Sequence, residues 1–466
     1  MKVKALTRTE RSVSRECKGD VRKHHRNLQP QYHPMQRARE YTRAVTSSKM
    51  DRMFAKPFVG DLGQRNGHSD AVLCAAICRK ALSLFVSGSA DGRVKLWDLT
   101  SRAEVAELQG HSQRVNGVVF DNVGGRHFYS CGNEGKIQCW SVRQDNVSNN
   151  ESSTGGSNPT PPQGPVETFR LQTPLQSIDH DWSSQSRFCT ASSESVDLWD
   201  PSRTSPIQSH KNLWGSADTV QVVRYNPAES HLVGICSADR GVGILDTRVG
   251  VALRKTVLRM RSNCLEWNPM EPMNFVVGNE DYNAYQMDMR NLTEPSRIYK
   301  GHTSAILSVS WSPTGKEFVT GSYDKTIRIF SQNRGTCRDV YHTKRMQRVQ
   351  TVHYTMDNRF ILSGSDEGGL RLWKARANEQ LSQPTVREEA ALSYRTALVE
   401  RYRHMPEVAR IQNSRKIPRV IQKQTAQAKL QKEKAERKQE NRIQHSRPGK
   451  YEHVSERKKI VVKEVK

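Results

Sequence analysis

Apolar positions recur along this chain with a period too long for a single helix or strand. Aligning the sequence on itself reveals a repeated segment, and most successive copies lie 42 to 46 residues apart. Units of roughly 40 to 45 residues, each holding four short strands, are typical of the blades of a β-propeller. Seven copies therefore predict seven blades. Each copy ends with an aromatic or other apolar residue, at Trp97, Trp140, Trp199, Leu245, Met287, Phe330 and Trp373.

The first repeat carries polar residues at fixed places among its apolar ones. It runs from a Gly-His pair at His68, through Ser87 and Asp91, to the Trp-Asp pair at Trp97. This arrangement resembles the WD40 signature, in which these four positions form a buried hydrogen-bond relay from a loop to the inner strands. A buried His, Asp and indole are stable only when they satisfy one another. We therefore predict a structural rather than a catalytic role for them.

The other repeats depart from this pattern to different degrees. In the second repeat His111 and Trp140 are present, but Glu134 stands where Asp is usual. In the sixth, His302 and Asp324 precede a phenylalanine, which has no N–H to donate. The sequence therefore predicts a complete relay only in the first repeat. Repeats three to five are more degenerate, and the seventh is recognisable.

These repeats define the expected fold class and domain boundaries. We predict an all-β, seven-bladed WD40 propeller over residues 53–380, with a basic N-terminal arm and an α-helical basic C-terminal extension. The step between Trp140 and Trp199 is 59 residues long, and its Ser-, Asn-, Gly- and Pro-rich part predicts a disordered insertion at about 143–165. Residues 54–62 are placed to close the ring by joining the last blade, which removes an open sheet edge.

The positive charge is concentrated at the two ends of the sequence. The chain has a net charge of +25, and residues 1–50 hold 13 Lys or Arg against 4 Asp or Glu. Residues 381–466 hold 22 against 10, whereas residues 51–380 are nearly balanced at 38 against 34. Basic arms favour a polyanionic partner, because each cation that reaches a phosphate releases counterions. The alternative is that they are solvated tails or import signals.

The two arms differ in predicted structure. Residues 1–52 show little apolar periodicity and predict an extended segment that orders on a partner. In residues 381–466, Thr385 and Glu388 form a capping box that begins a helix, whose apolar face we expect to dock under the propeller. Pro406 opens a second helix, and residues 419–445 predict a third that is almost wholly polar.

Basic side chains on these arms are the candidate RNA contacts. They are Arg22, Lys23, Arg26, Arg37, Arg39, Arg415, Lys416, Arg419, Lys423, Lys432, Lys434, Arg437, Lys438, Arg457, Lys458 and Lys459.

Several classes of function are disfavoured by what the sequence lacks. The nine cysteines are scattered without a C-x-x-C pair, which predicts reduced thiols and no metal site. There is no P-loop, nucleotide fingerprint or Ser-His-Asp order, so we predict no cofactor, no small-molecule substrate and no catalysis. No run of 18 apolar residues or signal-like N-terminus occurs, which predicts a soluble protein without a membrane partner.

One further segment carries a family resemblance. The degenerate propeller is followed by a tail running from Arg387 through Tyr402, His404 and Pro406 to Arg419. This combination resembles the suppressor-of-fibrillarin type of WD-repeat protein. The resemblance implies a nucleolar scaffold of the small-subunit processome. Its partners would be pre-ribosomal RNA, the U3 small nucleolar RNA and other processome proteins, and its role the maturation of small-subunit RNA.

The same family also implies an alternative function. Some of its members are substrate receptors of a cullin-RING ubiquitin ligase, which they join through an adaptor that reads an aromatic-Asp-x-Arg motif. Asp246 with Arg248, and Asp288 with Arg290, match the Asp-x-Arg part but lack the aromatic residue. The structural alternative is that each arginine only pairs locally at a strand end.

Overall fold

The structure is a computed structural model. It describes residues 29–62, 67–142, 164–183, 186–211, 213, 219–249, 251–447, 450–451 and 454–465. The expected insertion falls almost entirely on residues 143–163, which lie outside the described residues. The candidate RNA contacts Arg22, Lys23 and Arg26 also lie outside them.

Seven antiparallel sheets form the blades, and this confirms the predicted fold class. Blade 1 is β2 (Val72–Ile77), β3 (Leu84–Ser89), β4 (Arg93–Asp98) and β5 (Ala103–Gln109); blade 2 is β6 (Val115–Phe120), β7 (His127–Gly132), β8 (Lys136–Ser141) and β9 (Glu167–Arg170); blade 3 is β10 (Leu175–His180), β11 (Phe188–Ser192), β12 (Ser195–Trp199) and β13 (Gln208–Lys211). Blade 4 is β14 (Val220–Tyr225), β15 (Leu232–Ser237), β16 (Gly241–Asp246), β17 (Val251–Leu258) and β29 (Val461–Val465); blade 5 is β18 (Ser262–Trp267), β19 (Asn274–Asn279), β20 (Ala284–Asp288) and β21 (Arg297–Tyr299). Blade 6 is β22 (Ile306–Trp311), β23 (Glu317–Ser322), β24 (Ile327–Ser331) and β25 (Cys337–Tyr341); blade 7 is β26 (Val349–Tyr354), β27 (Phe360–Ser365), β28 (Leu370–Lys374) and β1 (Phe58–Leu62).

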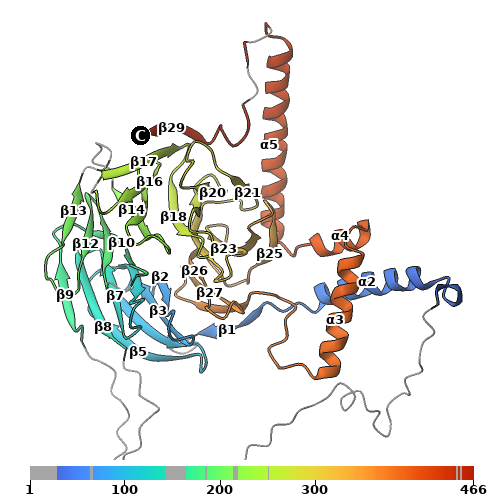
Figure 1. The fold of residues 1–466 in the computed structure, drawn as a ribbon, viewed down its shortest axis with the longest axis horizontal. Coiled ribbons are helices and arrows are strands. Elements are labelled where there is room, and N and C mark those ends of the chain that lie inside the picture. Colours follow the sequence, from blue (N-terminus) through green and yellow to red (C-terminus); the bar gives the residue numbers. More distant parts are fainter. Residues whose placement is uncertain are drawn as a thin grey trace, which may run out of the picture. The chain divides into compact units, whose positions relative to one another are not determined.

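The blades form a closed ring around a central axis (Figure 1). The first strand of each blade contacts the first strand of the next, and the last of these, β26, contacts β2. Closure depends on β1, which pairs with β28 so that Phe58 lies opposite Trp373. The predicted closing strand is thus confirmed. Because β1 comes from the start of the propeller sequence and β26 to β28 come from its end, blade 7 joins the two ends of the ring by strand pairing.

The hydrophobic core lies between blades rather than inside a single layer. The apolar residue that ends each repeat sits at or near the end of the third strand of its blade and is at most 1% exposed. In blade 3, Phe188 and Trp199 stack with their ring centroids 6.0 Å apart, and Tyr129 of blade 2 stacks on Phe188 at 4.7 Å. Such aromatic pairs hold adjacent sheets together, which is why the repeat periodicity is visible in the sequence.

A left-handed turn joins the second and third strands in most blades. Gly92, Gly135 and Gly368 occupy it in blades 1, 2 and 7 with φ between 77° and 80°. A Cβ on Gly92 would lie 2.6 Å from the carbonyl oxygen of His111 in the next blade. Glycine is therefore required at residue 92, because the backbone there has a positive φ and the neighbouring blade approaches too closely for a Cβ atom.

A second compact unit consists of helices from both ends of the described chain. It contains η1 (Pro30–Tyr32), α2 (Gln36–Met53), α3 (Val386–Arg401) and α4 (Pro406–Asn413), drawn in blue and orange in Figure 1. The predicted extended arm is wrong for α2, because Ala44 and Val45 are buried against Leu398 and Val408. That partner lies about 350 residues away, so the local pattern did not reveal it.

The helix predicted from the capping box is α3, and both reciprocal bonds of Thr385 and Glu388 are present. Leu398 of α3 packs in one core with Ala44 and Val45 of α2 and with Val408 of α4, and docking of this helix under the propeller stays a prediction. Tyr41 and Tyr402 meet edge to face at 6.1 Å, and the Tyr402 hydroxyl donates to Glu40 at 2.9 Å. Two weakly apolar arms thus complete one small core.

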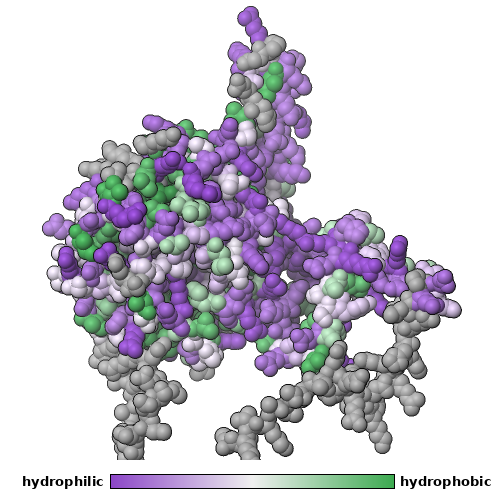
Figure 2. Space-filling view, in the orientation of Figure 1, coloured by the Kyte–Doolittle hydropathy of each residue, from purple (hydrophilic) through white to green (hydrophobic). Residues whose placement is uncertain are grey.

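The rest of the C-terminal region belongs with the propeller, so residues 381–466 are not one domain. Helix α5 spans Arg419–Gln444, and Ile421 in its first turn is buried. Thr303 of blade 6 donates to Gln424 at 3.1 Å. Strand β29 then pairs with β17 as a fifth strand of blade 4. Hydrophilic residues cover most of the visible surface of α5 (Figure 2). No helix among the described residues is long and apolar enough to span a membrane.

Candidate functional sites

Two blades contain a full chain of polar contacts from loop histidine to indole. In blade 1 the Ser87 hydroxyl lies 2.7 Å from His68 Nε2 and accepts from the Trp97 indole at 2.8 Å. In blade 2 Ser130 does the same for His111 at 2.8 Å and for Trp140 at 2.9 Å. The hydroxyl of the second strand is therefore the centre of each relay.

The acidic member of the relay does not follow the expectation from sequence. Glu134 Oε1 lies 2.9 Å from His111 Nδ1, whereas Asp91 Oδ2 lies 3.9 Å from His68 Nδ1. The prediction that only the first repeat holds a complete relay is therefore wrong. Glutamate has one more methylene group than aspartate, so its carboxylate reaches the ring directly from the same turn.

Blades 3, 6 and 7 keep parts of this arrangement. In blade 6 His302 lies 2.9 Å from Asp324 and 2.7 Å from Thr320, and Phe330 fills the place of the indole. The indoles of blades 3 and 7 donate to Thr190 at 2.9 Å and to Ser363 at 2.8 Å. Of the relay hydroxyls in these five blades, sequence reasoning named only that of Ser87. The available signal was a Ser or Thr nine or ten residues before each terminal aromatic residue.

Burial keeps the relay histidines neutral. It lowers the pKa of His68 to about 4 and also lowers the pKa of His111 and His302 below the usual value, against the opposing effect of their acidic partners. A neutral imidazole offers one donor and one acceptor, which matches one carboxylate and one hydroxyl. In blades 2 and 6 both ring nitrogens are thus used in linking strands, whereas in blade 1 only Nε2 of His68 is hydrogen-bonded among the described residues.

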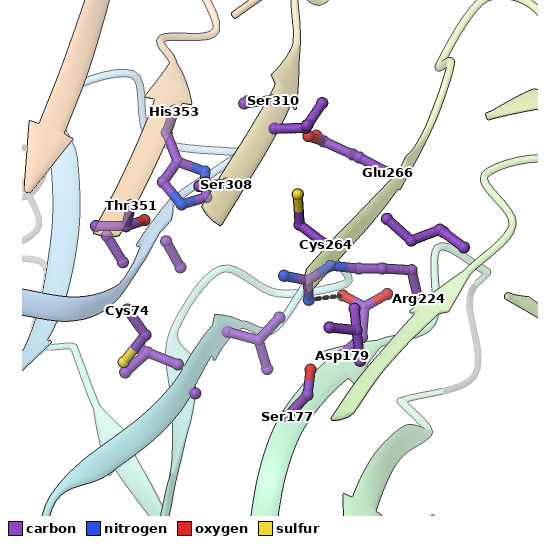
Figure 3. Close-up of a pocket in the computed structure, with 18 of the residues that line it drawn as sticks. Cys74, Ser177, Asp179, Arg224, Cys264, Glu266, Ser308, Ser310, Thr351 and His353 are labelled. Carbon is purple, nitrogen blue, oxygen red and sulfur yellow. Dashed lines mark ion pairs between the residues drawn. The ribbon is translucent and has the colours of Figure 1, made fainter. Parts of the chain in front are cut away.

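Further polar groups lie in the axial cavity, which has a volume of about 480 Å³ and is lined by the first strands of the blades. Figure 3 shows Asp179, Arg224, Glu266 and His353 directed toward this space. Arg224 pairs with Asp179 at 3.6 Å. The two carboxylates also accept backbone N–H groups from the following blade, Asp179 from Tyr225 at 2.7 Å and Glu266 from Trp311 at 3.1 Å.

The chemistry of the cavity supports a structural role. Burial raises the pKa of Glu266 to about 8 and that of the Cys264 thiol to about 12, and it lowers the pKa of His353 to about 4. A thiol with so high a pKa holds almost no thiolate at neutral pH and is a poor nucleophile. Among the described residues, no three His, Cys, Asp or Glu side chains lie together as a metal site. Asp179, Arg224 and Glu266 thus connect adjacent blades.

The candidate RNA contacts are divided between the two units. Arg37 and Arg39 are exposed on α2, while Arg415 donates to the carbonyls of Gln412 at 2.6 Å and Ser414 at 3.0 Å. The others lie on α5 or next to it. The exposed ones in the propeller unit are Lys416, Arg419, Lys423, Lys432, Lys434, Arg437, Lys438, Arg457, Lys458 and Lys459.

The structure brings the last of these groups together. Glu456 accepts from Lys432 at 2.7 Å and from Lys300 of blade 5 at 2.5 Å, and Lys459 donates to Gln439 at 3.5 Å. Residues 457–459 therefore lie beside the middle of α5. Residues 457–459 and the neighbouring cations of α5 form one basic region of the propeller unit.

The two Asp-x-Arg segments each close a tight local ion pair. Arg248 contacts Asp246 at 3.0 Å and Arg290 contacts Asp288 at 2.8 Å, and each arginine also donates through its Nε. The arginine side chains are 62% and 70% exposed. These ion pairs agree with the alternative that each arginine pairs locally at a strand end. The exposed fractions leave part of each guanidinium accessible to a partner.

Comparison with known proteins finds a Sof1-like domain in the C-terminal tail and WD repeats in the propeller sequence. A model of the Sof1-like domain matches residues 375–461, and WD domain G-beta repeat models match residues 61–98, 102–141, 293–331 and 335–374. The chain is 40% identical to Protein SOF1 of Saccharomyces cerevisiae, with 94% of this chain and 89% of that protein aligned. It is 41% identical to DDB1- and CUL4-associated factor 13 of Danio rerio and of Homo sapiens, over the full length of both chains in each case.

The chain belongs to the Sof1 family. Among solved structures, the β-propeller domain of Cps50 (Swd1) from Myceliophteria thermophila matches this Sof1-family chain with a TM-score of 0.56 and 14% identity, covering 68% of this chain and 98% of that one. That likeness shows the propeller fold alone. The WD repeat models match blades 1, 2, 6 and 7, which are the repeats that the sequence made recognisable, and they leave the degenerate blades 3 to 5 unmatched.

The matched Sof1-like domain does not coincide with one structural unit. Residues 375–461 include α3 and α4 of the helical unit and α5 of the propeller unit. The domain thus connects a helical core made with α2 to a long polar helix. In a Sof1-family protein, these are the parts that an ordinary WD repeat protein does not share.

Proposed function

We propose that this Sof1-family protein is a non-catalytic scaffold of the small-subunit processome in the nucleolus. In this role it associates with the U3 small nucleolar RNA, pre-ribosomal RNA and other processome proteins, and supports maturation of small-subunit RNA. The observation that carries the proposal is the joining of a propeller, whose relay side chains bind one another, to an exposed helix on which six cations have no acidic partner among the described residues. Similarity to Protein SOF1 over 94% of the chain supports it.

The mechanism is architectural. Propeller surfaces hold neighbouring proteins, and cations on α2 and α5 bind phosphate groups and stabilise one arrangement of the RNA. Phosphate contacts position a protein without reading sequence, so cleavage of the RNA belongs to other molecules.

Crosslinking in cells tests this proposal. The full-length tagged protein is irradiated in living cells, and the bound RNA is sequenced beside that of an unrelated tagged WD repeat protein. We expect U3 and pre-ribosomal RNA to be clearly enriched over the control, because cations held on the phosphate backbone bring neighbouring side chains close to the bases with which irradiation crosslinks them. Enrichment of neither RNA would overturn the proposal. Substitutions are preferable to removal of residues 381–466, since removal exposes Ala44 and Val45.

The second candidate is a substrate receptor of a cullin-RING ubiquitin ligase. The exposed guanidinium edges of Arg248 and Arg290 favour it, as does the association with DDB1 and CUL4 that the relatives' name states. Co-purification with the adaptor should fall severalfold in an Arg248→Ala and Arg290→Ala double variant. Unchanged recovery of the adaptor, or none with the wild type, would remove this candidate.

A further inference from the structure

The cations of α5 are not distributed evenly around the helix. At roughly 100° per residue, six of them fall within an arc of about 140°, and no acidic residue shares this arc. They extend over about 35 Å along the helix axis. The α5 basic face consists of Arg419, Lys423, Lys434, Arg437, Lys438 and Arg442. All six side chains are exposed, and none forms an ion pair within the part of the chain that the structure describes.

The opposite side of α5 carries all of the acidic residues of the helix and its two remaining lysines. Lys429 lies 3.7 Å from Glu433, and Lys432 lies 3.7 Å from Glu436. Lys432 is also 2.7 Å from Glu456, which follows the helix in sequence. The cations on this paired face are therefore already compensated inside the chain. A solvated helix that is exposed only for solubility usually mixes positive and negative side chains on every face. On α5 the acidic side chains are all on one side.

Contacts at both ends of the segment fix which way the basic face points. Near its start, Ile421 is buried on a side of the helix outside the basic arc, and Gln424, at the edge of that arc, accepts from Thr303 of blade 6. Farther along, Glu456 joins Lys432 to Lys300 of blade 5, and β29 continues into blade 4. The paired face is thus held toward the returning chain, and the basic face is left to solvent.

We propose that the α5 basic face binds the phosphate backbone of double-stranded RNA. This inference rests on the proposed function, which makes RNA the available polyanion. Fixed cations on a rigid helix match a rigid backbone with regularly spaced phosphates. The face has no aromatic residue. Single strands are usually held by stacking of bases on aromatic rings, so a duplex is the better fit.

Other partners fit this face less well. Val420 and Leu430 are its exposed aliphatic side chains, at 66% and 57% exposure. A helix that binds a membrane surface needs a continuous apolar face opposite its charges, whereas the side opposite the basic face carries Glu433, Glu436 and Glu440. Two isolated aliphatic groups are typical of a solvent-exposed helix.

Two matched variants of the full-length protein test the inference. Lys434→Gln with Lys438→Gln removes two charges from the basic face, and Lys429→Gln with Lys432→Gln removes two from the paired face. Both lower the net charge equally, and Gln and Lys have similar helix propensities. Circular dichroism and thermal unfolding verify that both variants keep the fold.

Binding is measured by fluorescence anisotropy with a labelled RNA duplex of arbitrary sequence and a single strand of equal length, at several salt concentrations. We expect the basic-face variant to bind the duplex about tenfold more weakly and to reduce the slope of log K against log salt by about 2, because two phosphate contacts are lost. The paired-face variant should change affinity by less than about twofold, because its lysines make no phosphate contact.

Three results would overturn the inference: equal losses in the two variants, equal affinity for the single strand, or tighter binding to anionic phospholipid vesicles than to the duplex. The proposed function fails separately. Crosslinks to U3 in cells together with equal losses in the two variants would remove only the basic-face inference. Selective loss in the basic-face variant without crosslinks in cells would remove only the processome assignment.

Discussion

Polar groups in the propeller and polar groups on α5 follow opposite arrangements. In blade 2, the buried Ser130 hydroxyl serves both His111 and Trp140, and Glu134 completes the chain of contacts. On the basic face of α5, six exposed cations have no acidic partner within the described residues. Buried polar groups must be paired because desolvation is costly, whereas exposed charges remain hydrated until a partner replaces the water. The first pattern specifies the fold, and the second is available for binding.

The largest expected loss of stability comes from emptying the space between blades. Trp140 is fully buried, stacks on Phe128 at 6.3 Å and donates to Ser130. Trp140→Ala should lower the free energy of unfolding by about 3 to 5 kcal/mol, measured by urea denaturation. Leu430→Ala on α5, where the side chain is 57% exposed, serves as the contrast and should cost less than about 0.5 kcal/mol. Similar losses in the two variants would contradict the comparison.

Removing the relay hydroxyl has the next largest effect. Ser130→Ala leaves the Trp140 indole N–H and the His111 ring nitrogen without their buried partner, which should cost about 2 to 3 kcal/mol in urea denaturation. Ser130→Thr is the matched control, because Thr320 and Thr190 make the equivalent contacts in blades 6 and 3. A hydroxyl that only fills space would give equal losses in both variants.

Acid should weaken the relay through its histidines. Burial lowers the pKa of His68 from the ordinary 6.5 to about 4, so between these values the folded state binds fewer protons than the unfolded state. Stability therefore falls as the pH falls through this window, and by pH 5 this single residue contributes a loss of about 2 kcal/mol. Urea midpoints at pH 7.5 and pH 5 measure the effect. His68→Asn should show a smaller decrease, and an identical pH dependence would exclude His68 as a cause.

Much of the propeller was predictable from sequence, because each blade repeats the same packing problem. The terminal aromatic residues and the helix cap at Thr385 follow clear sequence patterns, and the closing strand β1 follows from the need of a ring of repeats to pair its open edge. The core of α2, α3 and α4 was not predictable. Its residues, such as Val45 and Leu398, are far apart in sequence and sit in arms that are mainly polar.

For the candidate binding site, the sequence predicted only which segments are rich in basic residues. The sequence indicated which segments are basic, and it grouped Lys432 with Lys434 and Lys438 as equivalent candidates. The structure separates them, because Glu456 pairs with Lys432 only after the chain returns from α5 to blade 4. Charge compensation by a residue 24 positions away has no local sequence signal.

The smallest expected effect concerns this returning segment. Hydrogen bonds from Lys300 and Lys432 lower the pKa of Glu456 to about 2, so the bridge is present at neutral pH. The three side chains are roughly half exposed, and solvent screening limits the contribution of such a bridge to less than about 1 kcal/mol. Glu456→Gln should therefore leave the urea midpoint of the propeller nearly unchanged, while hydrogen exchange of the β29 amides becomes a few times faster. Exchange unaltered in β29 would show that pairing with β17 alone holds the strand, and that the orientation of α5 depends on Ile421 and Gln424 rather than on the bridge.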